Sequence, residues 1–186
     1  MVVEMNELEA EGLRVVASLM AVASKTAPKG FGVDCVETAL VDGEEKDELA
    51  ELMEEMANEL GDPLYRRDAE SVRASGAVLL IGLKDGGQVA NANCGACGFP
   101  SCQDMLRARR AGKLFPGPTC IVRALDFGIA VGSAVKVCSM LNVDSRVMFR
   151  VGVAARRLGL LKSDLVLGVP LAVKSKSPFF DRVFKA

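Results

Sequence analysis

Three cysteines of this chain lie within nine residues and a fourth follows after a spacer, in the pattern Cys94-x2-Cys97-x4-Cys102-x17-Cys120. Thiols this close together can form a disulfide knot, bind zinc or hold an iron–sulfur cluster. Composition argues against the disulfide knot, because 186 residues, half of them apolar, can bury a core that needs no covalent cross-links. We expect a cytoplasmic protein, in which clustered cysteines stay reduced and more often serve metal or redox chemistry.

The spacing of the four cysteines favours an iron–sulfur cluster over zinc. Four thiolates can complete a tetrahedral zinc site or hold a [4Fe–4S] cube with one sulfur on each iron. Structural zinc sites usually present two tight Cys-x2-Cys pairs, and here only Cys94 and Cys97 have that form. The chain contains no histidine, which excludes Rieske ligation and mixed cysteine–histidine zinc sites. A zinc-stabilised interaction module stays open as an alternative.

The residues around the cysteines suit a cluster. Gly95 and Gly98 lack side chains, so their amides can turn toward cluster sulfur. Ser101 and the acid three residues later form an N-cap signature, which places Cys102 in the first turn of a helix that we expect to end at Gly112. The positive end of that helix would stabilise an anionic, thiolate-ligated cluster.

Buried strands alternate with amphipathic helices along the rest of the chain, which predicts an α+β fold built as a layered α/β sandwich. Strands are expected at 33–41, 76–83 and 164–173, the first of them buried on both faces. Helices are expected at 42–60, 66–75, 122–141, 145–158 and, at the beginning of the chain, 7–24. Asp42 and Glu45 predict a capping box, and residues 85–87 predict a turn.

The chain shows no low-complexity segment, repeat or long linker. We therefore expect residues 1–186 to form a single domain, with an iron–sulfur segment at 92–121 as an excursion from it. A net charge of −1 gives no general attraction for nucleic acid. Asp126 and Lys136 interrupt the longest apolar stretch, so no membrane span is expected, and the first residues do not resemble a signal peptide.

For several other residues that could take part in chemistry, the sequence favours a structural role. Cys35 and Cys138 lie among apolar residues and are predicted to be buried free thiols. Gly128 and Gly132, one helical turn apart, are predicted to allow close helix packing. The solvated face of a helix is predicted for Arg107, Arg109 and Arg110. No constellation of acid, base and nucleophile stands out, so no catalytic residue is predicted.

The cysteine segment resembles the four-cysteine [4Fe–4S] module of electron-transfer subunits and corrinoid iron–sulfur proteins, over NCGACGFPSCQDMLRARRAGKLFPGPTC. By that resemblance Cys94, Cys97, Cys102 and Cys120 would be the ligands. The wider sequence is similar to a prokaryotic family of uncharacterised ferredoxin-domain proteins, over GPTCIVRALDFGIAVGSAVKVCSMLNVDSRVMFRVGVAARRLGL and GVPLAVKSKSPFFDR. That resemblance covers nearly the whole chain. It implies a [4Fe–4S] cluster and says almost nothing about the reaction. Our leading hypothesis is a cluster protein that transfers single electrons to a redox partner of unknown identity.

The order of helices and strands is similar to that of nitroreductase-like flavoproteins. The stretches Leu125-Asp126-Phe127-Gly128-Ile129-Ala130 and Leu158-Gly159-Leu160 resemble that family's central helix and the segment after it. This resemblance implies an α+β sandwich, an intertwined homodimer and, as an alternative function, an FMN-dependent reductase supplied by the cluster. Half of the residues are apolar, which also predicts that a further surface is buried in a homodimer.

The same resemblance implies an FMN site at the dimer interface, lined by residues 25–32. Lys25 and Lys29 could supply charge to the phosphate, and Gly30 could let the backbone approach it. The family's S-R-R-S-x-R segment at the first helix has no counterpart, because residues 1–14 contain only Arg14. Desolvating a phosphate without bidentate guanidinium partners is costly, so we expect the protein to contain the cluster but no tightly bound FMN.

Overall fold

The computed structural model describes residues 2–84 and 89–180, so the turn predicted at 85–87 lies outside the described residues. The elements, in chain order, are α1 (Met5–Thr26), the 3-10 helix η1 (Gly30–Gly32), β1 (Val36–Val41), α2 (Gly43–Leu60), α3 (Leu64–Ala74), β2 (Ala77–Leu83), α4 (Cys102–Arg107), α5 (Ile121–Met140), β3 (Asp144–Ser145), α6 (Phe149–Arg157) and β4 (Leu165–Ala172). A helix with the roughly 20 apolar residues needed to span a bilayer does not occur in this part of the chain.

The strands form one antiparallel sheet in the order β1-β2-β4-β3. Leu80 of β2 pairs with Ala39 on one side and Gly168 on the other. The strand β2 is buried along its whole length, as its apolar sequence predicts. The strand β1 departs from the prediction, because only Val36 and Val41 are buried. The reason is that β1 lies at the edge of the sheet, where helices and strands cover it less completely.

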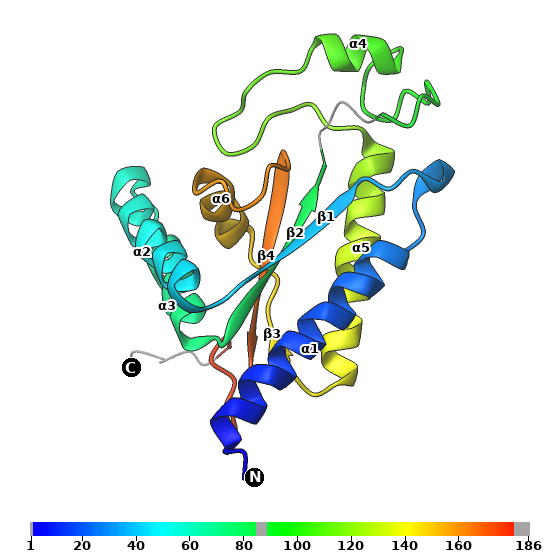
Figure 1. Ribbon diagram of the computed structural model, residues 1–186. Helices are drawn as coiled ribbons and strands as arrows, with labels where there is room; N and C mark the ends of the chain where they lie inside the picture. Colours follow the sequence, from blue (N-terminus) through cyan, green and yellow to red (C-terminus); the bar gives the residue numbers. More distant parts are fainter. Residues whose placement is uncertain (1, 85–88, 181–186) are drawn as a thin grey trace.

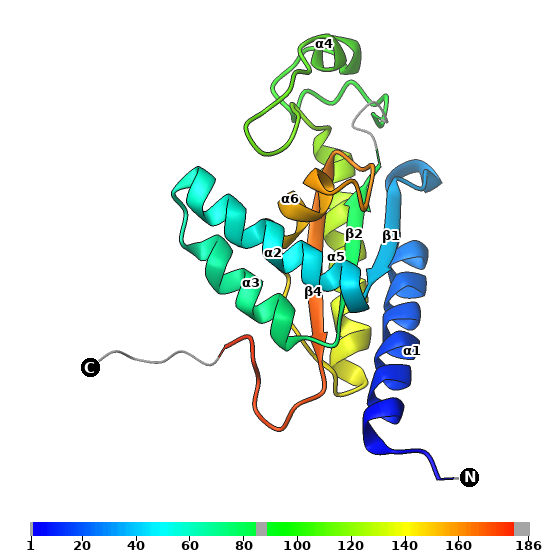
Figure 2. The ribbon, with the colours of Figure 1, turned by 60° about the vertical axis from the view of Figure 1, so that its left-hand side comes forward.

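Helices cover both faces of this sheet, which confirms the predicted layered α+β fold (Figures 1 and 2). The helices α1 and α5 lie on one face, and α2, α3 and α6 lie on the other. Side chains of β2 alternate between the two cores: Leu79 and Ile81 pack with α1 and α5, whereas Val78 and Leu80 pack with the other three helices. Each layer is therefore anchored by alternate residues of a single strand.

The start of α2 differs from the predicted capping box. Among the described residues, no backbone N–H of this helix donates to the side chain of Asp42. The carboxylate of Asp42 instead accepts a hydrogen bond from Arg14 Nε at 2.9 Å. The capping-box prediction was therefore wrong, because an ion pair with α1 takes the carboxylate. The other end of α2 has the usual form, with Gly61 in the left-handed conformation at φ 64°.

The helix predicted at 145–158 is shorter than its apolar pattern indicates. Residues 144–145 pair with β4 as β3, and α6 begins only at Phe149. Before the helix, Met148 and Gly168 exchange two backbone hydrogen bonds of 2.8 and 3.1 Å, which hold the chain extended. The helix then lies directly against β4, because a Cβ on Gly152 would stand 1.8 Å from the carbonyl oxygen of Val166.

Residues 89–120 leave the sandwich and lie beyond one end of the sheet (Figure 1). We call residues 89–120 the excursion. The helix α4 ends at Arg107 rather than at Gly112, and the chain reverses instead. Two backbone hydrogen bonds of 2.8 and 3.0 Å between Arg110 and Gly117 close this reversal. Gly112 serves the loop, since a Cβ there would lie 2.1 Å from the carbonyl oxygen of Phe115.

One arginine predicted to lie on a solvated helix face is largely buried. Nη2 of Arg109 donates to Oδ2 of Asp164 at 2.6 Å, and only 13% of the Arg109 side chain is exposed. Asp164 directly precedes β4, so this ion pair fastens the excursion to the sandwich. Arg107 does occupy the solvated position, with 78% of its side chain exposed.

Candidate metal centre

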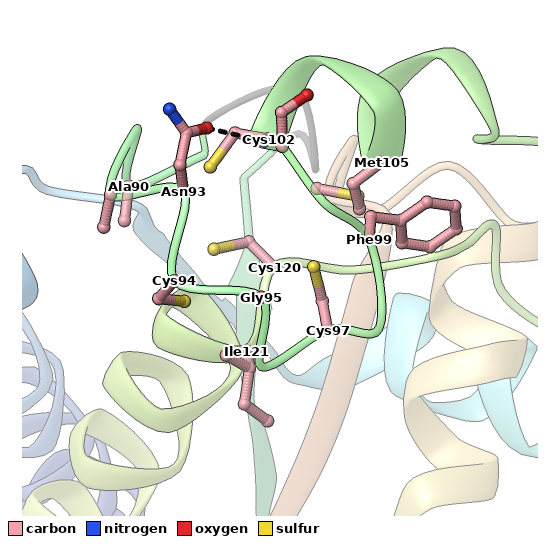
Figure 3. A pocket seen from close by; sticks show the side chains of 12 residues that line it. Ala90, Asn93, Cys94, Gly95, Cys97, Phe99, Cys102, Met105, Cys120 and Ile121 are labelled. Atoms are coloured by element: carbon pink, nitrogen blue, oxygen red, sulfur yellow. Dashed lines mark hydrogen bonds between the residues drawn. The ribbon is translucent and has the colours of Figure 1, made fainter.

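Four cysteine side chains surround one small cavity in the excursion (Figure 3). Cys94 and Cys97 come from the loop after β2, Cys102 is the first residue of α4, and Cys120 is the N-cap of α5. The structure therefore brings together the four residues that the sequence spacing singled out, from three separate segments of the chain.

Residues in the left-handed conformation shape the loop that carries the first two cysteines. Asn93, Gly95 and Gly98 have φ angles of 46°, 73° and 87°, a region that glycine adopts freely and asparagine tolerates. The N–H of Gly98 donates to the carbonyl of Gly95 at 2.9 Å and closes a turn. Oδ1 of Asn93 accepts a hydrogen bond from the N–H of Cys102 at 2.9 Å, which joins the loop to α4.

The predicted N-cap of α4 is confirmed. Oγ of Ser101 accepts the N–H of Asp104 at 3.1 Å and donates to Oδ2 of Asp104 at 2.6 Å. Cys102 therefore stands in the first turn, near the partial positive charge of the helix N-terminus. Because α4 has only six residues, its dipole adds little, and the backbone anchor from Asn93 is the firmer constraint on Cys102.

The cavity is shielded on the side of the sandwich and accessible on the side of the loop. Cys102 and Cys120 are 9% and 6% exposed, in an apolar cluster with Val89 and Met105. Cys94 is exposed, by contrast. A redox group held here would lie in a low-dielectric pocket and still reach the surface, and both factors tune the potential of an iron–sulfur cluster.

The four thiols surround a cavity but do not stand at the distances of a bound metal group. Within the described residues, no three cysteine, aspartate or glutamate side chains already form a group that could hold a metal ion. The cavity between the thiols has room for about one water molecule. A cluster is larger than that, so it would fit only if the thiols stood farther apart, as an outward shift of the exposed loop with Cys94 and Cys97 would allow. The glycines of that loop, which have open space around them, permit such a movement.

The two remaining cysteines are buried free thiols, as predicted. Burial raises the pKa of the Cys35 thiol, and the neighbouring carboxylate of Asp126 raises it further. Burial also raises the pKa of Cys138, whose Sγ donates to the carbonyl of Val143 at 3.2 Å. Both thiols are therefore held in the protonated form, which is the opposite of what a metal ligand or nucleophile needs.

The residues expected to line an FMN site lie in the last turn of α1 and in the loop after it, and their polar groups already have partners. Lys25 forms an ion pair with Asp34. Nζ of Lys29 donates to three carbonyl oxygens at 2.8–3.0 Å, those of Ser24, Lys25 and Ala27, and so satisfies the end of α1. Gly30 hydrogen-bonds through both its N–H and its carbonyl to side chains of α5. A phosphate at this position would have to displace these contacts.

Sequence reasoning missed the two charged side chains of α5 that hold Gly30. Arg123 and Asp126 are 3% and 4% exposed, in a helix that is otherwise strongly apolar. The signal was present in the sequence, because opposite charges three residues apart lie on the same face of a helix. They stand in the first two turns of the helix that follows Cys120 and join that helix to Gly30.

The fold is similar to that of nitroreductase-like proteins of known structure. Nitroreductase CinD from Lactococcus lactis, solved in complex with chloramphenicol, is similar with a TM-score of 0.60 over 94% of this chain and 84% of that one, at 12% identity. NADPH:FMN oxidoreductase from Vibrio harveyi, solved in complex with NAD+, gives a TM-score of 0.50 over 92% and 64%, at 15% identity. At these identities the likeness concerns the fold alone, and it confirms the fold expected from the order of elements.

The chain belongs to a family of uncharacterised proteins that contain a ferredoxin domain, DUF2148. The family model matches residues 116–182, a range that includes Cys120 and none of the other three clustered cysteines. An uncharacterised protein from Archaeoglobus fulgidus is 50% identical over 185 residues, which cover 100% of both chains. The ferredoxin domain supports an iron–sulfur redox role for the family.

Proposed function

We propose that this protein holds a [4Fe–4S] cluster on Cys94, Cys97, Cys102 and Cys120 and transfers single electrons. The observation that carries the proposal is the convergence of four thiols from three segments on one cavity. Membership of a ferredoxin-domain family supports the same chemistry. Such a cluster, when bound, supplies one-electron redox chemistry whose potential depends on hydrogen bonds to sulfur and on solvent exposure.

Different residues of the chain would bind such a group, shield it from water and expose it to a partner. Cys102 and Cys120 provide the buried thiolates, and Val89 and Met105 exclude water behind them. The loop around Cys94 stays at the surface, where a redox partner protein can approach. Thiols that must stay reduced to bind iron are stable in the cytoplasm, where we place the protein.

Metal analysis of anaerobically purified protein tests the ligand set. The four single alanine variants at the proposed ligands should lose iron, sulfide and the broad brown absorbance that a reductant bleaches. Cys35→Ala and Cys138→Ala remove buried thiols elsewhere and should keep the full complement. Retention of a complete cluster by Cys120→Ala would contradict the assignment. Colourless protein that contains zinc would support the structural alternative instead.

The nitroreductase-like fold gives a second candidate function, an FMN-dependent reductase supplied by the cluster. Lys25, Lys29 and Gly30 would line its phosphate site. Their existing contacts within the chain argue against tight binding. We therefore expect no FMN in the supernatant after acid precipitation. Stoichiometric FMN in that supernatant would favour the reductase over the electron-transfer protein.

We further propose that the protein is a homodimer that buries the outer surface of α1 and α5. Large apolar side chains are exposed along this surface, among them Leu8, Val15, Leu19, Val22, Leu125 and Ile129. The close helix packing predicted at Gly128 and Gly132 does not occur within the described chain, because nothing lies within 4 Å of a Cβ built on either. A helix of a second copy would supply it, and the apolar face would then be covered.

Sedimentation at micromolar concentration tests the dimer. Gly132→Leu adds a side chain in open space, so the protomer should fold while the dimer dissociates. Val147→Glu, at a position that is 40% exposed outside this surface, is the control and should stay dimeric. A parent protein that sediments only as a monomer would contradict the proposal.

A further inference from the structure

A second cavity lies where the first turns of α3 and α6 meet the excursion, and no cysteine lines it. Its volume is about 170 Å³, close to the roughly 150 Å³ of an engineered protein cavity that binds benzene. One six-membered ring therefore fits it. The lining consists of Leu60, Asp62, Tyr65, Lys113, Leu114, Phe149 and Arg150.

The hydroxyl of Tyr65 is a buried polar group on the wall of this cavity. The residue is 2% exposed, and among the described residues its Oη atom has no hydrogen-bond partner. A buried hydroxyl without a partner is costly, so such groups normally meet a ligand or an ordered water. Burial raises the pKa of Tyr65 above its ordinary value of 10.0. The hydroxyl therefore keeps its proton at neutral pH and can donate a hydrogen bond to an acceptor.

The charges around the cavity leave one cation for a ligand. Arg150 is engaged with Asp62 at 2.9 Å, faces Asp68 at 3.9 Å, and lies 5.6 Å from the centre of the Tyr65 ring. Lys113 is exposed, and none of the described residues forms an ion pair or hydrogen bond with its ammonium group. A single free positive charge beside Asp62 suits a monoanion and disfavours a dianion such as a phosphate.

We propose that this cavity binds a small carboxylic acid that carries one apolar ring. Its carboxylate accepts hydrogen bonds from the Tyr65 hydroxyl and the Lys113 ammonium group, and its ring contacts Leu114 and Phe149. Tyr65 and Phe149 each belong to the first turn of a helix, and the partial positive charge at both helix starts favours a carboxylate there.

The site is joined to the excursion but does not rest on the proposed cluster. Lys113 and Leu114 belong to the loop between Cys102 and Cys120. The ring of Phe115 in the same loop packs edge-on against Phe149, with ring centres 5.0 Å apart. Binding can therefore be measured whether or not metal is bound.

Calorimetric titration of the purified full chain with benzoate tests the proposal. A ligand of this size should bind with a dissociation constant of about 1 mM. Benzamide, which has the same shape without the charge, should bind about tenfold more weakly. Tyr65→Phe should weaken benzoate by about tenfold through the lost hydrogen bond to a charged group. Lys113→Gln should weaken it by about threefold.

Two controls make the result specific to this cavity. Lys136→Gln removes an exposed lysine of α5 and should leave the affinity unchanged. The chain contains a single tyrosine, so selective labelling of tyrosine rings gives one NMR signal, which benzoate should shift with the calorimetric affinity. The proposal is overturned if benzoate gives neither saturable heat nor a shift at roughly ten times the expected dissociation constant. Equal losses for Lys113→Gln and Lys136→Gln, or none for Tyr65→Phe, overturn it as well.

Discussion

Arg123 and Asp126 form a buried ion pair one helical turn after Cys120, with 2.9 Å between Nη1 and Oδ2. Each also holds Gly30: Arg123 donates to its carbonyl at 2.9 Å, and Asp126 accepts its N–H at 2.8 Å. The loop after α1 approaches α5 so closely that a Cβ on Gly30 would stand 2.7 Å from Val122. The helix that presents Cys120 is thus fixed to the loop after the N-terminal helix by charged groups that water hardly reaches.

Loss of the Asp126 carboxylate should strongly destabilise the protein. Asp126→Ala breaks the buried ion pair with Arg123 and should lower the free energy of unfolding by about 3–5 kcal/mol. The double variant Arg123→Met/Asp126→Leu, which removes both charges, should be less destabilised than Asp126→Ala alone. Urea unfolding of both variants gives the comparison. A double variant as unstable as the single one would show that the packing of α5, and not the charge pair, carries the effect.

Glycine substitutions should separate crowded from open positions. Gly152→Ala forces a Cβ to within 1.8 Å of the Val166 carbonyl and should cost about 3 kcal/mol or more. In the Gly132→Leu background, which we expect to be monomeric, Gly128→Ala places a Cβ of a helix in open space and should instead gain up to about 1 kcal/mol from helix propensity. Thermal unfolding measures both changes. Similar values for the two variants would contradict the direct packing of α6 on β4.

Asn93 should control how firmly the proposed cluster is held. Asn93→Gly keeps the positive φ and removes the acceptor for the Cys102 N–H, a loss of about 1 kcal/mol. We expect this variant to release iron to a chelator about fivefold faster than the parent. Asn91→Gly, at another positive φ of 55°, is the matched control. Equal release from the parent and Asn93→Gly would assign no anchoring role to this hydrogen bond.

The buried thiol of Cys138 should make stability depend on alkaline pH. Because burial raises its pKa in the folded chain, the unfolded chain loses this proton first, near the ordinary value of 9.0. The stabilisation is fully present below that pH and is lost as the pH rises through the folded pKa. Urea unfolding between pH 8 and 10 should show a decline that is smaller in Cys138→Ala. Parallel pH profiles for the parent and the variant would contradict this assignment.

Removal of the Tyr65 hydroxyl should stabilise the ligand-free protein. Tyr65→Phe eliminates a buried polar atom that has no partner among the described residues, which should add up to about 1 kcal/mol to the free energy of unfolding. The substitution that weakens benzoate would then strengthen the fold, and a merely structural tyrosine would not behave in this way. A loss of stability of about 1 kcal/mol or more would indicate that a hydrogen bond supports this hydroxyl in the free protein.

Sequence patterns predicted the elements whose burial is periodic and local. The apolar run of β2 and the amphipathic pattern of α2 each specify their environment within a few residues, and both elements lie where the sequence indicated. The start of α6 could not be read in this way. Its position depends on backbone bonds between Met148 and Gly168, two residues twenty positions apart whose side chains carry no pairing signal.

The two candidate sites also differ in how much of each can be recognised from local sequence. The four cysteines form a motif of one residue type at short spacing, so the sequence alone was sufficient to predict that they converge on one cavity. The cavity around Tyr65 has no motif, because α2, α3, α6 and the excursion each contribute ordinary residues to it. The burial of Arg109 was also missed, because its partner Asp164 is 55 positions away and nothing near Arg109 in sequence indicates burial.

The unequal exposure of the four clustered thiols sets the order in which they would be damaged. Dioxygen and other oxidants reach Cys94 from solvent, whereas the sandwich and the excursion protect Cys102 and Cys120. Oxidation of a cysteine begins at an accessible thiolate and becomes irreversible beyond the sulfenic acid. Air should therefore oxidise Cys94 first and Cys102 and Cys120 later. A thiol reductant can reach oxidised Cys94 from solvent, whereas it cannot reach the two buried cysteines in the folded protein.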